Sequence, residues 1–393
     1  MKNDIEMISP LKDMQKYIVE NATNIPNDAS ILSAWRELLS ASTSTEKVYQ
    51  SPEFFDFLTD TNSGHDHIEV LVIKNADTRH IIGIIPIRFR AQVFRYSLGA
   101  RSLAAPTLQV ITLLGSVPLI SPDHAGFEAL LQYLFKNYPS CGAVSMPSLP
   151  LNSVWHSYIQ RSAVIENEYC NYVIDEWREC HLIPLAPSFD EYLQRFNSKK
   201  RFNLKRQVRL LREFSGTDLQ LDRVEHTDQI PTLIAARKSM VPAEWLPQLL
   251  GQKIYQGLAR QGLFLSYVLR SGDRAYAVIV ATRSERKLLI HNIYYHPDVA
   301  HLSAGISILY MAIEDLITNL HMENLDLGYS NPANNHHASN EIEIRGHMLL
   351  LRKTWKNRLL ILTHQAYVTL FNEIKKMLGK QKIRRLLDWT KNK

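Results

Sequence analysis

The sequence predicts an α/β (α+β) fold of two similar modules in tandem, each a mixed, mainly antiparallel sheet flanked by helices. Three observations predict it. The chain has 393 residues, which is more than one hydrophobic core usually serves. Its composition, 45% hydrophobic and 21% charged, is typical of a globular protein. Apolar residues recur with the period of strands and then of a helix, in the order strand, strand, strand, helix, strand, and this order occurs twice.

The first copy is expected within residues 31–180, after a polar leader at residues 1–30 that is either loosely ordered or a single docking helix. The second helix of this copy begins at Ser51-Pro52, where the missing N–H of proline costs nothing. The expected elements are, in order, a helix from Ile31, the helix from Ser51, strands 68–73, 81–88 and 109–114, helix 125–138 and strand 143–146. The helix at 125–138 does not begin with a glycine-containing loop, so this copy is expected to be degenerate and to shape the acceptor side of a site.

The second copy is expected within residues 181–350 and has stronger periodicity. Ser271-Gly272-Asp273 and the segment 283–286 separate three apolar runs, which predicts an antiparallel meander. The expected elements are strand 182–185, helices 189–197, 199–212, 230–241 and 248–261, strands 263–269, 275–282 and 287–295, a helix over 306–320 and strand 324–329.

The start of the helix after the meander is the best candidate for a ligand site. A helix start presents free backbone N–H groups and the positive end of the helix dipole, which suits a phosphate. The small residues Ser303, Ala304 and Gly305, followed by Ile306, allow close approach to such a group. An alternative interpretation is an ordinary helix end that the Ser303 hydroxyl caps.

This order of elements resembles the acyl-CoA-dependent GNAT N-acyltransferases. It is most similar to their two-domain branch, which includes CelD-type cellulose-biosynthesis proteins and Fem-type peptidoglycan aminoacyltransferases. Two further blocks carry the resemblance, residues 188–206 and residues 82–87 with 113–116. GNAT proteins usually carry Arg/Gln-x-x-Gly-x-Gly/Ala at the phosphate loop, and Ala300–Gly305 keeps only the last glycine of that pattern.

The resemblance implies acyl-CoA as co-substrate and direct attack by an acceptor amine, without an acyl-enzyme. The thioester would lie between the third and fourth strands of the core, where proximity and a backbone N–H provide most of the rate. Tyr329 is the expected proton donor to the thiolate, and His291 or Asp326 the expected base. His291 and Asp326 each have a structural alternative: His291 could be a core histidine, and Asp326 could be a carboxylate that caps or pairs structurally. The residues expected to contact the cofactor are Tyr294, Tyr295, Ser303, Ala304, Gly305 and Ile306.

Basic residues of the helix at 199–212 are candidates for binding the acceptor. Lys199, Arg201 and Lys205 are predicted to contact it, together with Arg345, the one basic residue of segment 341–346. The run has three interpretations: a solvated face, a site for phosphates of CoA or of a nucleotide-linked acceptor, or a tRNA-binding surface. Only Phe202 interrupts the run with an aromatic ring, so we rank nucleic acid below small phosphate-bearing molecules.

No metal site is expected. The segment 331–340 contains His336 and His337, but two adjacent histidines point to different sides and nothing nearby completes a tetrahedral set. The three cysteines form no C-x-x-C pair, which indicates a reducing compartment. With no signal peptide or membrane-spanning run in view, the expected location is the cytoplasm.

The tail, residues 351–393, is expected to form a basic amphipathic helix. From Arg352 to Lys393 there are twelve Lys and Arg against Glu373 and Asp388, a local charge of +10. Since the chain carries +6 in total, the remaining residues sum to −4. Such a helix is typical of a binder of anionic lipid at the inner face of a membrane, and packing against the body is the alternative.

The function that these features predict is transfer of an acyl group from acyl-CoA to an amine, or less readily a hydroxyl. The expected acceptor is a sugar, an amino acid or an envelope or polysaccharide precursor, either a small molecule or a lipid- or nucleotide-linked one. Two other functions stay open: Fem-like aminoacyl transfer from charged tRNA, and a non-catalytic binding role in polysaccharide assembly.

Overall fold

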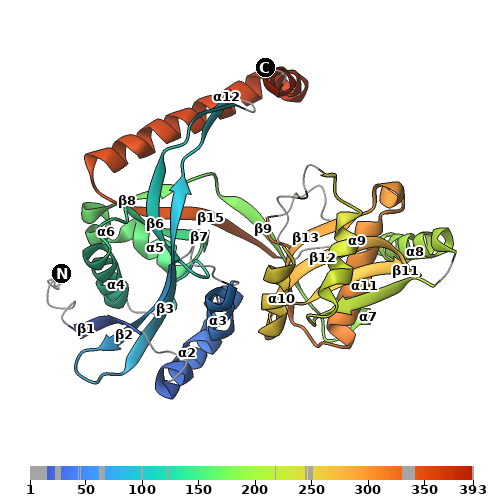
Figure 1. Cartoon of the computed structure of the whole chain (residues 1–393), viewed down its shortest axis with the longest axis horizontal. Coiled ribbons are helices and arrows are strands. Elements are labelled where there is room, and N and C mark those ends of the chain that lie inside the picture. The colour runs from blue at the N-terminus through green and yellow to red at the C-terminus, as the bar shows by residue number, and fades with distance from the viewer. Residues whose placement is uncertain are drawn as a thin grey trace, which may run out of the picture. The chain divides into compact units, whose positions relative to one another are not determined.

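The computed structural model describes residues 16–22, 28–42, 44, 46–61, 67–98, 101–121, 124–216, 218–243, 246, 251–329 and 341–391, with side chains of the last helix up to 374. Contacts divide the chain into two units (Figure 1). Unit 1 comprises Met1–Glu46, Ser63–Trp177 and Arg345–Lys393, and unit 2 comprises Lys47–Asn62 and Arg178–Ile344.

Unit 1 is built on a sheet of strand order β1-β2-β3-β6-β7-β15, with β8 also paired to β15. Neighbouring strands are antiparallel except β6 and β7. Its elements are, in order, β1 (Tyr17–Asn21), α2 (Ala29–Ala41), β2 (Ile68–Asn75), β3 (Ile81–Val93), β4 (Tyr96–Leu98), β5 (Arg101–Ala104), β6 (Thr107–Leu113), α4 (His124–Asn137), β7 (Ala143–Pro150), α5 (Val154–Arg161), α6 (Ala163–Glu168), β8 (Tyr169–Val173), β15 (Glu341–Arg352) and α12 (Trp355–Lys391).

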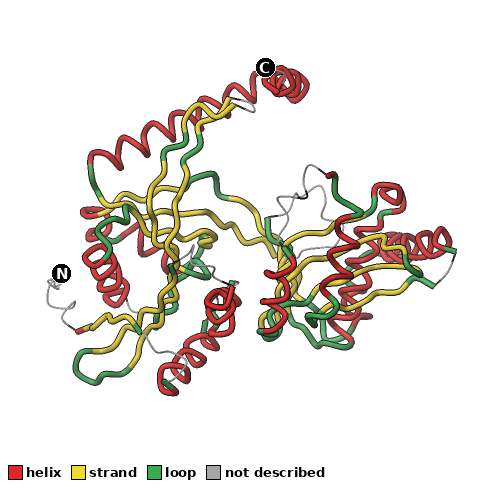
Figure 2. The backbone as a smooth tube through the Cα atoms, in the orientation of Figure 1, coloured by secondary structure: helices red, strands yellow, loops and turns green. Residues whose placement is uncertain are grey.

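Unit 2 has a sheet of order β9-β14-β13-β12-β11-β10, in which only β13 and β14 are parallel. Figure 2 shows its strands and helices. The elements are η3 (Lys47–Gln50), α3 (Pro52–Thr61), β9 (Arg178–Pro184), α7 (Phe189–Gln194), α8 (Ser198–Ser215), β10 (Gln220–Val224), α9 (Ile230–Lys238), α10 (Gln252–Arg260), β11 (Ser266–Ser271), β12 (Arg274–Ser284), β13 (Lys287–Tyr295), η5 (Pro297–Leu302), α11 (Ala304–Thr318) and β14 (Asn324–Asp326).

Both units repeat one topology, as the sequence predicts. An antiparallel meander leads into a helix, and the strand after the helix pairs in parallel with the last strand of the meander. A further strand then pairs antiparallel with the strand after the helix: β15 with β7 in unit 1, and β9 with β14 in unit 2. In unit 1 this strand is β15, and in the chain the strands β9 to β14 of unit 2 lie between it and β8. In unit 2 the corresponding strand is β9, which comes before the meander.

By contacts the chain divides differently from the contiguous ranges 31–180, 181–350 and 351–393. By contacts, residues from Arg345 onward belong to unit 1, because β15 pairs with β7 and β8 there. The segment Lys47–Asn62 belongs to unit 2, where α3 packs on α10. A Cβ at Gly257 of α10 would lie 2.8 Å from the Phe57 ring, so this glycine permits the close approach of the two helices.

The main core of unit 2 lies between its sheet and α7, α8 and α11. Leu204, Val208 and Leu211 face it at helical spacing, which leaves the cations of α8 on the outside. Asn197 caps α8 by accepting from the Lys200 amide, and Gly216, with φ +69°, ends it. On the other face α9 contacts β11 and β12, and α10 packs on α9.

Several strands of the structure have no counterpart in the sequence prediction. β1 lies in the segment expected to be a leader, β4, β5, β8 and β10 have only three to five residues each, and the twelve-residue β15 was not predicted as a strand. Within the described ranges, no helix has the length and apolar character needed to cross a bilayer. Cys141, Cys170 and Cys180 are free thiols.

Candidate functional site

The two parallel strands of unit 2 pair over a short distance and then separate. The register joins Lys287 with Asn324, Leu288 with Leu325 and Leu289 with Asp326. β13 continues to Tyr295, whereas β14 ends at Asp326 and the chain turns at Gly328, which has φ +61°. Among the residues that the structure describes, β14 does not pair with β13 beyond Leu289, so the backbone N–H and C=O groups on that edge of β13 can bind a ligand.

His291 is the extra residue of a β-bulge in β13. The register with β12 joins Ala281 to Ile290 and Val280 to Asn292, so His291 lies between two paired positions. Bulges re-aim side chains and often occur beside active sites. Its Nε2 lies 3.0 Å from Thr282 Oγ1, and the residue as a whole is exposed to solvent. Desolvation lowers the pKa of His291 below its ordinary value of 6.5, and the nearby Asp326 carboxylate opposes this shift.

Asp326 has a structural position at the end of β14. The carboxylate is fully buried, its Oδ1 accepts a 2.8 Å hydrogen bond from the Gly328 amide, and its Oδ2 lies 3.9 Å from Lys287 Nζ. These contacts shape the turn that carries the chain away from β13. Asp326 therefore has the features of the structural alternative, a carboxylate that holds a turn, and its predicted role as base stays a prediction.

Tyr329 follows this turn and is partly exposed. The guanidinium of Arg178 lies 4.6 Å from the centre of its ring. A Cβ at the preceding Gly328 would lie 3.7 Å from the carbonyl oxygen of Ile290, one residue before the bulge. The turn thus brings the start of the segment after β14 beside the bulged part of β13, and three predicted residues, His291, Asp326 and Tyr329, gather at the point where the strands separate.

The start of α11 carries open backbone amides. Ser303 adopts a left-handed conformation, with φ 57° and ψ 42°, and its side chain makes no capping hydrogen bond. The Ser303 carbonyl accepts from the amides of Ile306 and Ser307. The amides of Ala304 and Gly305 have no acceptor among the residues that the structure describes. The alternative of a helix capped by the Ser303 hydroxyl is therefore wrong, and the first amides are free to bind an anion.

The helix start lies against the end of β13. A Cβ at Gly305 would lie 3.2 Å from Tyr295 Cδ1 and 3.7 Å from Ile293 Cγ2, so a glycine allows the close approach. Tyr294, the neighbour of Tyr295 on the alternating strand, points to the other face. There the charge of Arg237 acts on both Tyr294 and Tyr255. The structure thus brings Tyr295 together with the predicted phosphate loop and separates Tyr294 from it.

Five side chains around the helix start were not predicted from the sequence. The ring centres of Phe214, at the end of α8, and His301 are 6.3 Å apart. The guanidinium of Arg274 lies over the rings of Phe214 and Tyr276. Arg274 Nη2 lies 3.3 Å from Asp298 Oδ2 in η5. They come from three separate segments, so no local pattern marks them as neighbours.

The structure does not place the cations that were predicted to bind the acceptor near the start of α11. Burial raises the pKa of Glu314 and the ammonium of Lys205 opposes this, which places Lys205 near Glu314. Glu314 is ten residues beyond Ala304, about 15 Å along α11. Lys199 and Arg201 lie further toward the start of α8, where Arg201 donates to the Phe196 carbonyl. The basic helix is exposed, as a solvated face would be.

Arg345 is a second departure from the prediction. Its side chain is 1% exposed, and it lies on the part of β15 that pairs with Pro150 in unit 1. In this structure Arg345 therefore has no surface to offer to an acceptor. His336 and His337 lie outside the described residues. Among the residues that the structure does describe, no group of three or more His, Cys, Asp or Glu side chains could hold a metal ion.

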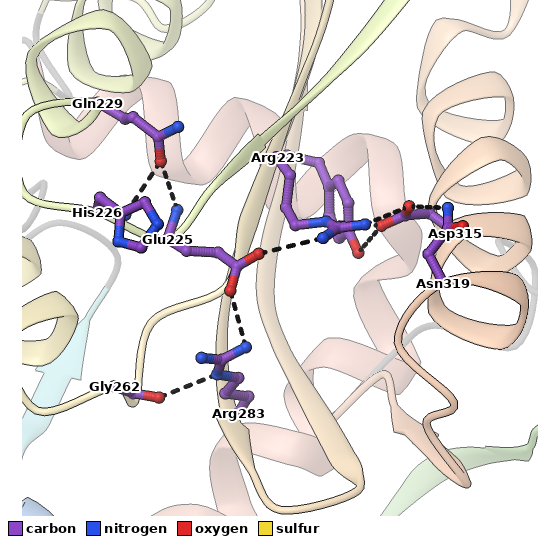
Figure 3. A network of polar contacts seen from close by, with 9 residues as sticks. Arg223, Glu225, His226, Gln229, Gly262, Arg283, Asp315 and Asn319 are labelled. Carbon is purple, nitrogen blue, oxygen red and sulfur yellow. Dashed lines mark hydrogen bonds and ion pairs between the residues drawn. The ribbon is translucent and has the colours of Figure 1, made fainter.

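A polar network fastens α11 to the sheet (Figure 3). Asp315 accepts from Arg223 through both carboxylate oxygens, at 2.6 and 3.0 Å, and from the Tyr267 hydroxyl at 2.9 Å. Asn319 donates to it at 2.7 Å. Glu225 then links Arg223 to Arg283, whose Nε donates to the Gly262 carbonyl. The hydrogen bonds lower the pKa of Asp315 despite its burial, so the carboxylate is charged at neutral pH.

We expect Asp315→Leu to reduce the free energy of unfolding by about 2–3 kcal/mol, because the Arg223 charge and the buried Tyr267 hydroxyl lose their shared acceptor. Tyr267→Phe, which removes one bond, should cost about 1 kcal/mol. Urea unfolding at pH 7 and pH 3 measures both. A lowered carboxylate pKa contributes stability above its unfolded value of about 3.8, lost as pH falls through the folded value. Equal losses at both pH values for Asp315→Leu would contradict this account.

Comparison with known proteins identifies the class of this fold. Residues 198–337 match the family model of the acetyltransferase (GNAT) domain. FemX is similar over 84% of this chain and 98% of its own, with 9% identity and a TM-score of 0.55. A tandem GNAT protein from the clavulanic acid biosynthesis pathway is similar over 86% and 98%, with 9% identity and a TM-score of 0.52.

A conserved protein of unknown function from Bacteroides thetaiotaomicron matches over 82% of this chain and 97% of its own, at 10% identity and a TM-score of 0.51. No curated protein sequence matches the chain. The fold and the separated strands define an acyl- or aminoacyl-transferase-like protein. Residues 198–337 carry a GNAT domain, and the fold of the chain is that of two GNAT-like modules in tandem.

Proposed function

We propose that unit 2 transfers an acyl group from acyl-CoA to an amine, or less readily a hydroxyl, by direct attack in a ternary complex. The proposed acceptor is a sugar, an amino acid or an envelope or polysaccharide precursor. The observation that carries the proposal is the combination of the open edge of β13 with a helix start whose first amides, Ala304 and Gly305, are free. These two features adjoin through the contact of Gly305 with Tyr295.

The residues of this chain fit a pyrophosphate at the helix start. The amides of Ala304 and Gly305 supply two donors, and Arg274 and His301 lie on the adjoining segments. The cofactor supplies the activated thioester. Backbone N–H groups along the open edge of β13 would orient its carbonyl by hydrogen bonding.

The proton transfers fall to side chains at the separation of the strands. The amine nitrogen forms its bond to the thioester carbon, and the thiolate leaves when the tetrahedral intermediate collapses. His291, held toward the neutral form, would take the ammonium proton, and Tyr329 would give its proton to the thiolate sulfur. Asp326, which is close enough to influence the pKa of His291, would stabilise the imidazolium that forms.

A second candidate is aminoacyl transfer from charged tRNA. It is favoured by the exposed cations of α8, which continue from Lys199 through Lys205 to Arg209 and Arg212. Such a surface binds a phosphate backbone in a salt-dependent manner. A non-catalytic binding role in polysaccharide assembly is the third candidate, because the loop at Ala300–Gly305 departs from the usual glycine pattern.

Thermal unfolding of the full chain with acetyl-CoA, a longer acyl-CoA and free CoA tests the proposal. A ligand at a hundredfold its dissociation constant should stabilise the fold by about 2.7 kcal/mol. Stabilisation by any of the three supports acyl-CoA binding. If none of them stabilises the chain while aminoacyl-tRNA binds with a steep salt dependence, the second candidate replaces the first. If neither binds, the non-catalytic role is favoured.

A further inference from the structure

The first half of α12 is held on the body of unit 1 by one face. Asn357, Ile361 and His364 are buried, and Ile361 joins the core formed by Phe94 and Leu349 among others. The Tyr172 hydroxyl lies 2.5 Å from His364 Nδ1. Further along, the Tyr367 hydroxyl donates to the Ser97 carbonyl at 2.7 Å and Tyr96 contacts Thr363. The position of the helix over the β4–β5 ribbon is therefore specified by hydrogen bonds as well as by packing (Figure 1).

The opposite face of the same helix is apolar, and none of the residues that the structure describes covers it. Trp355 is 71% exposed and Leu362 is 63% exposed, with Leu359 and Leu370 also exposed. Trp355 and Leu359 are two residues before Asn357 and Ile361, which is about 200° around the helix. The four exposed apolar residues and the exposed Ala366 lie at helical spacing, so that they form one stripe about 22 Å long on the helix. We call Trp355, Leu359, Leu362, Ala366 and Leu370 the apolar stripe.

A shallow apolar groove adjoins the stripe. Its volume is about 640 Å³, and α12 forms one wall with Trp355 and Leu359. Tyr96, Leu103 and Ala104 of the β4–β5 ribbon line the other side. Leu103 is among the most exposed large apolar side chains of the described chain. The ribbon and the helix thus extend one continuous apolar surface, which is larger than scattered exposed leucines would make.

Positive charge is concentrated on the same helix. The backbone of α12 continues to Lys391, and the segment 375–391 carries seven Lys and Arg against Asp388. With Lys353, Lys356 and Arg358 at the other end, cations flank the apolar stripe along the chain. The rest of the chain sums to a negative charge, so this distribution is local to the helix and does not reflect the composition as a whole.

We propose that the apolar stripe and the cations of α12 dock unit 1 on an anionic membrane surface. A helix of this kind lies in the plane of the interface, with its apolar residues among the upper acyl chains and its cations against acidic headgroups. A second copy of the chain is a poorer occupant, because two tails of +10 would face each other. A nucleic acid would use the cations and leave the leucines exposed. The proposal is independent of the reaction that unit 2 performs.

Flotation of the full chain with vesicles tests the proposal. Vesicles of phosphatidylcholine with 30% phosphatidylglycerol should carry the protein, and pure phosphatidylcholine vesicles should carry much less. Raising NaCl from 0.05 to 0.5 M should weaken the binding, because salt screens the cations. The double variant Leu359→Glu/Leu362→Glu should bind the anionic vesicles about tenfold or more weakly, since two leucines no longer enter the lipid.

Val154→Glu is the matched control, since Val154 is also an exposed apolar residue on a helix of unit 1. It should bind as the native chain does. All three proteins should unfold at similar temperatures, because the stripe is not part of the core. Trp355 fluorescence, taken as the difference from Trp355→Phe, should shift to the blue on vesicles.

Three results would overturn the proposal. The native chain could fail to bind the anionic vesicles at low salt, or the double variant could bind them as well as the native chain does. The third result is concentration-dependent dimerisation of the native chain that the double variant abolishes while its vesicle binding is unchanged, which would assign the stripe to a second copy.

Discussion

Replacing Gly305 with Trp is expected to abolish the binding of acyl-CoA and CoA, a loss of at least a hundredfold in affinity. Even a Cβ at this position would lie 3.2 Å from Tyr295 Cδ1, and an indole would fill the space in front of the free amides of Ala304 and Gly305. Calorimetric titration of the native chain and the variant measures the difference. The stabilisation of about 2.7 kcal/mol expected at a hundredfold the dissociation constant should vanish in the variant.

Gly251→Trp is the matched control, because Gly251 also lies at the start of a helix and no described atom lies within 4 Å of a Cβ placed there. A second pair separates charge from bulk. Gly305→Glu and Gly305→Gln have the same size, but the carboxylate repels a pyrophosphate while it suits the helix dipole. The Glu variant should bind CoA about tenfold or more weakly than the Gln variant. Equal binding by both would mean that the phosphates lie elsewhere.

His291→Gln is expected to lower kcat about a hundredfold with little change in the KM for acyl-CoA. General base catalysis contributes about 10²–10⁴ to a rate, and glutamine retains a polar partner for Thr282 while it cannot take a proton at neutral pH. Thr282→Val, which removes the partner and leaves the base in place, should have a smaller effect. Unchanged activity of His291→Gln would assign the imidazole to the structure of the bulge.

The pH dependence gives a second readout of the same role. The base must be neutral, and the surroundings lower the pKa of His291 below 6.5, so kcat/KM should fall only as pH drops through that lowered value. This acid limb should be missing in His291→Gln. The same shift links to stability, because the unfolded chain binds the proton more readily and stability from this group is lost as pH falls. The rates should therefore be measured only at pH values at which intrinsic fluorescence shows that the protein is folded.

Local patterns in the sequence were sufficient to predict most of unit 2. The strand predicted at 287–295 coincides with β13, Lys287–Tyr295, whose apolar run and bounding turns mark its two ends. The start of α11 was predicted at a run of small residues that permits close approach of backbones. The repetition of the meander and helix in both halves was also predicted from the periodicity of apolar residues, because each strand or helix that buries one face carries that periodicity.

Tertiary structure decided what depends on partners far apart in the chain. Pairing of β15 with β7 places Arg345 in unit 1 and buries it, which no local signal around residue 345 reveals. The antiparallel course of α8 along α11 carries Phe214 to the phosphate loop and leaves Lys199 and Lys205 away from it. The bulge at His291 arises from a mismatch of two registers, and a register exists only once both strands are paired.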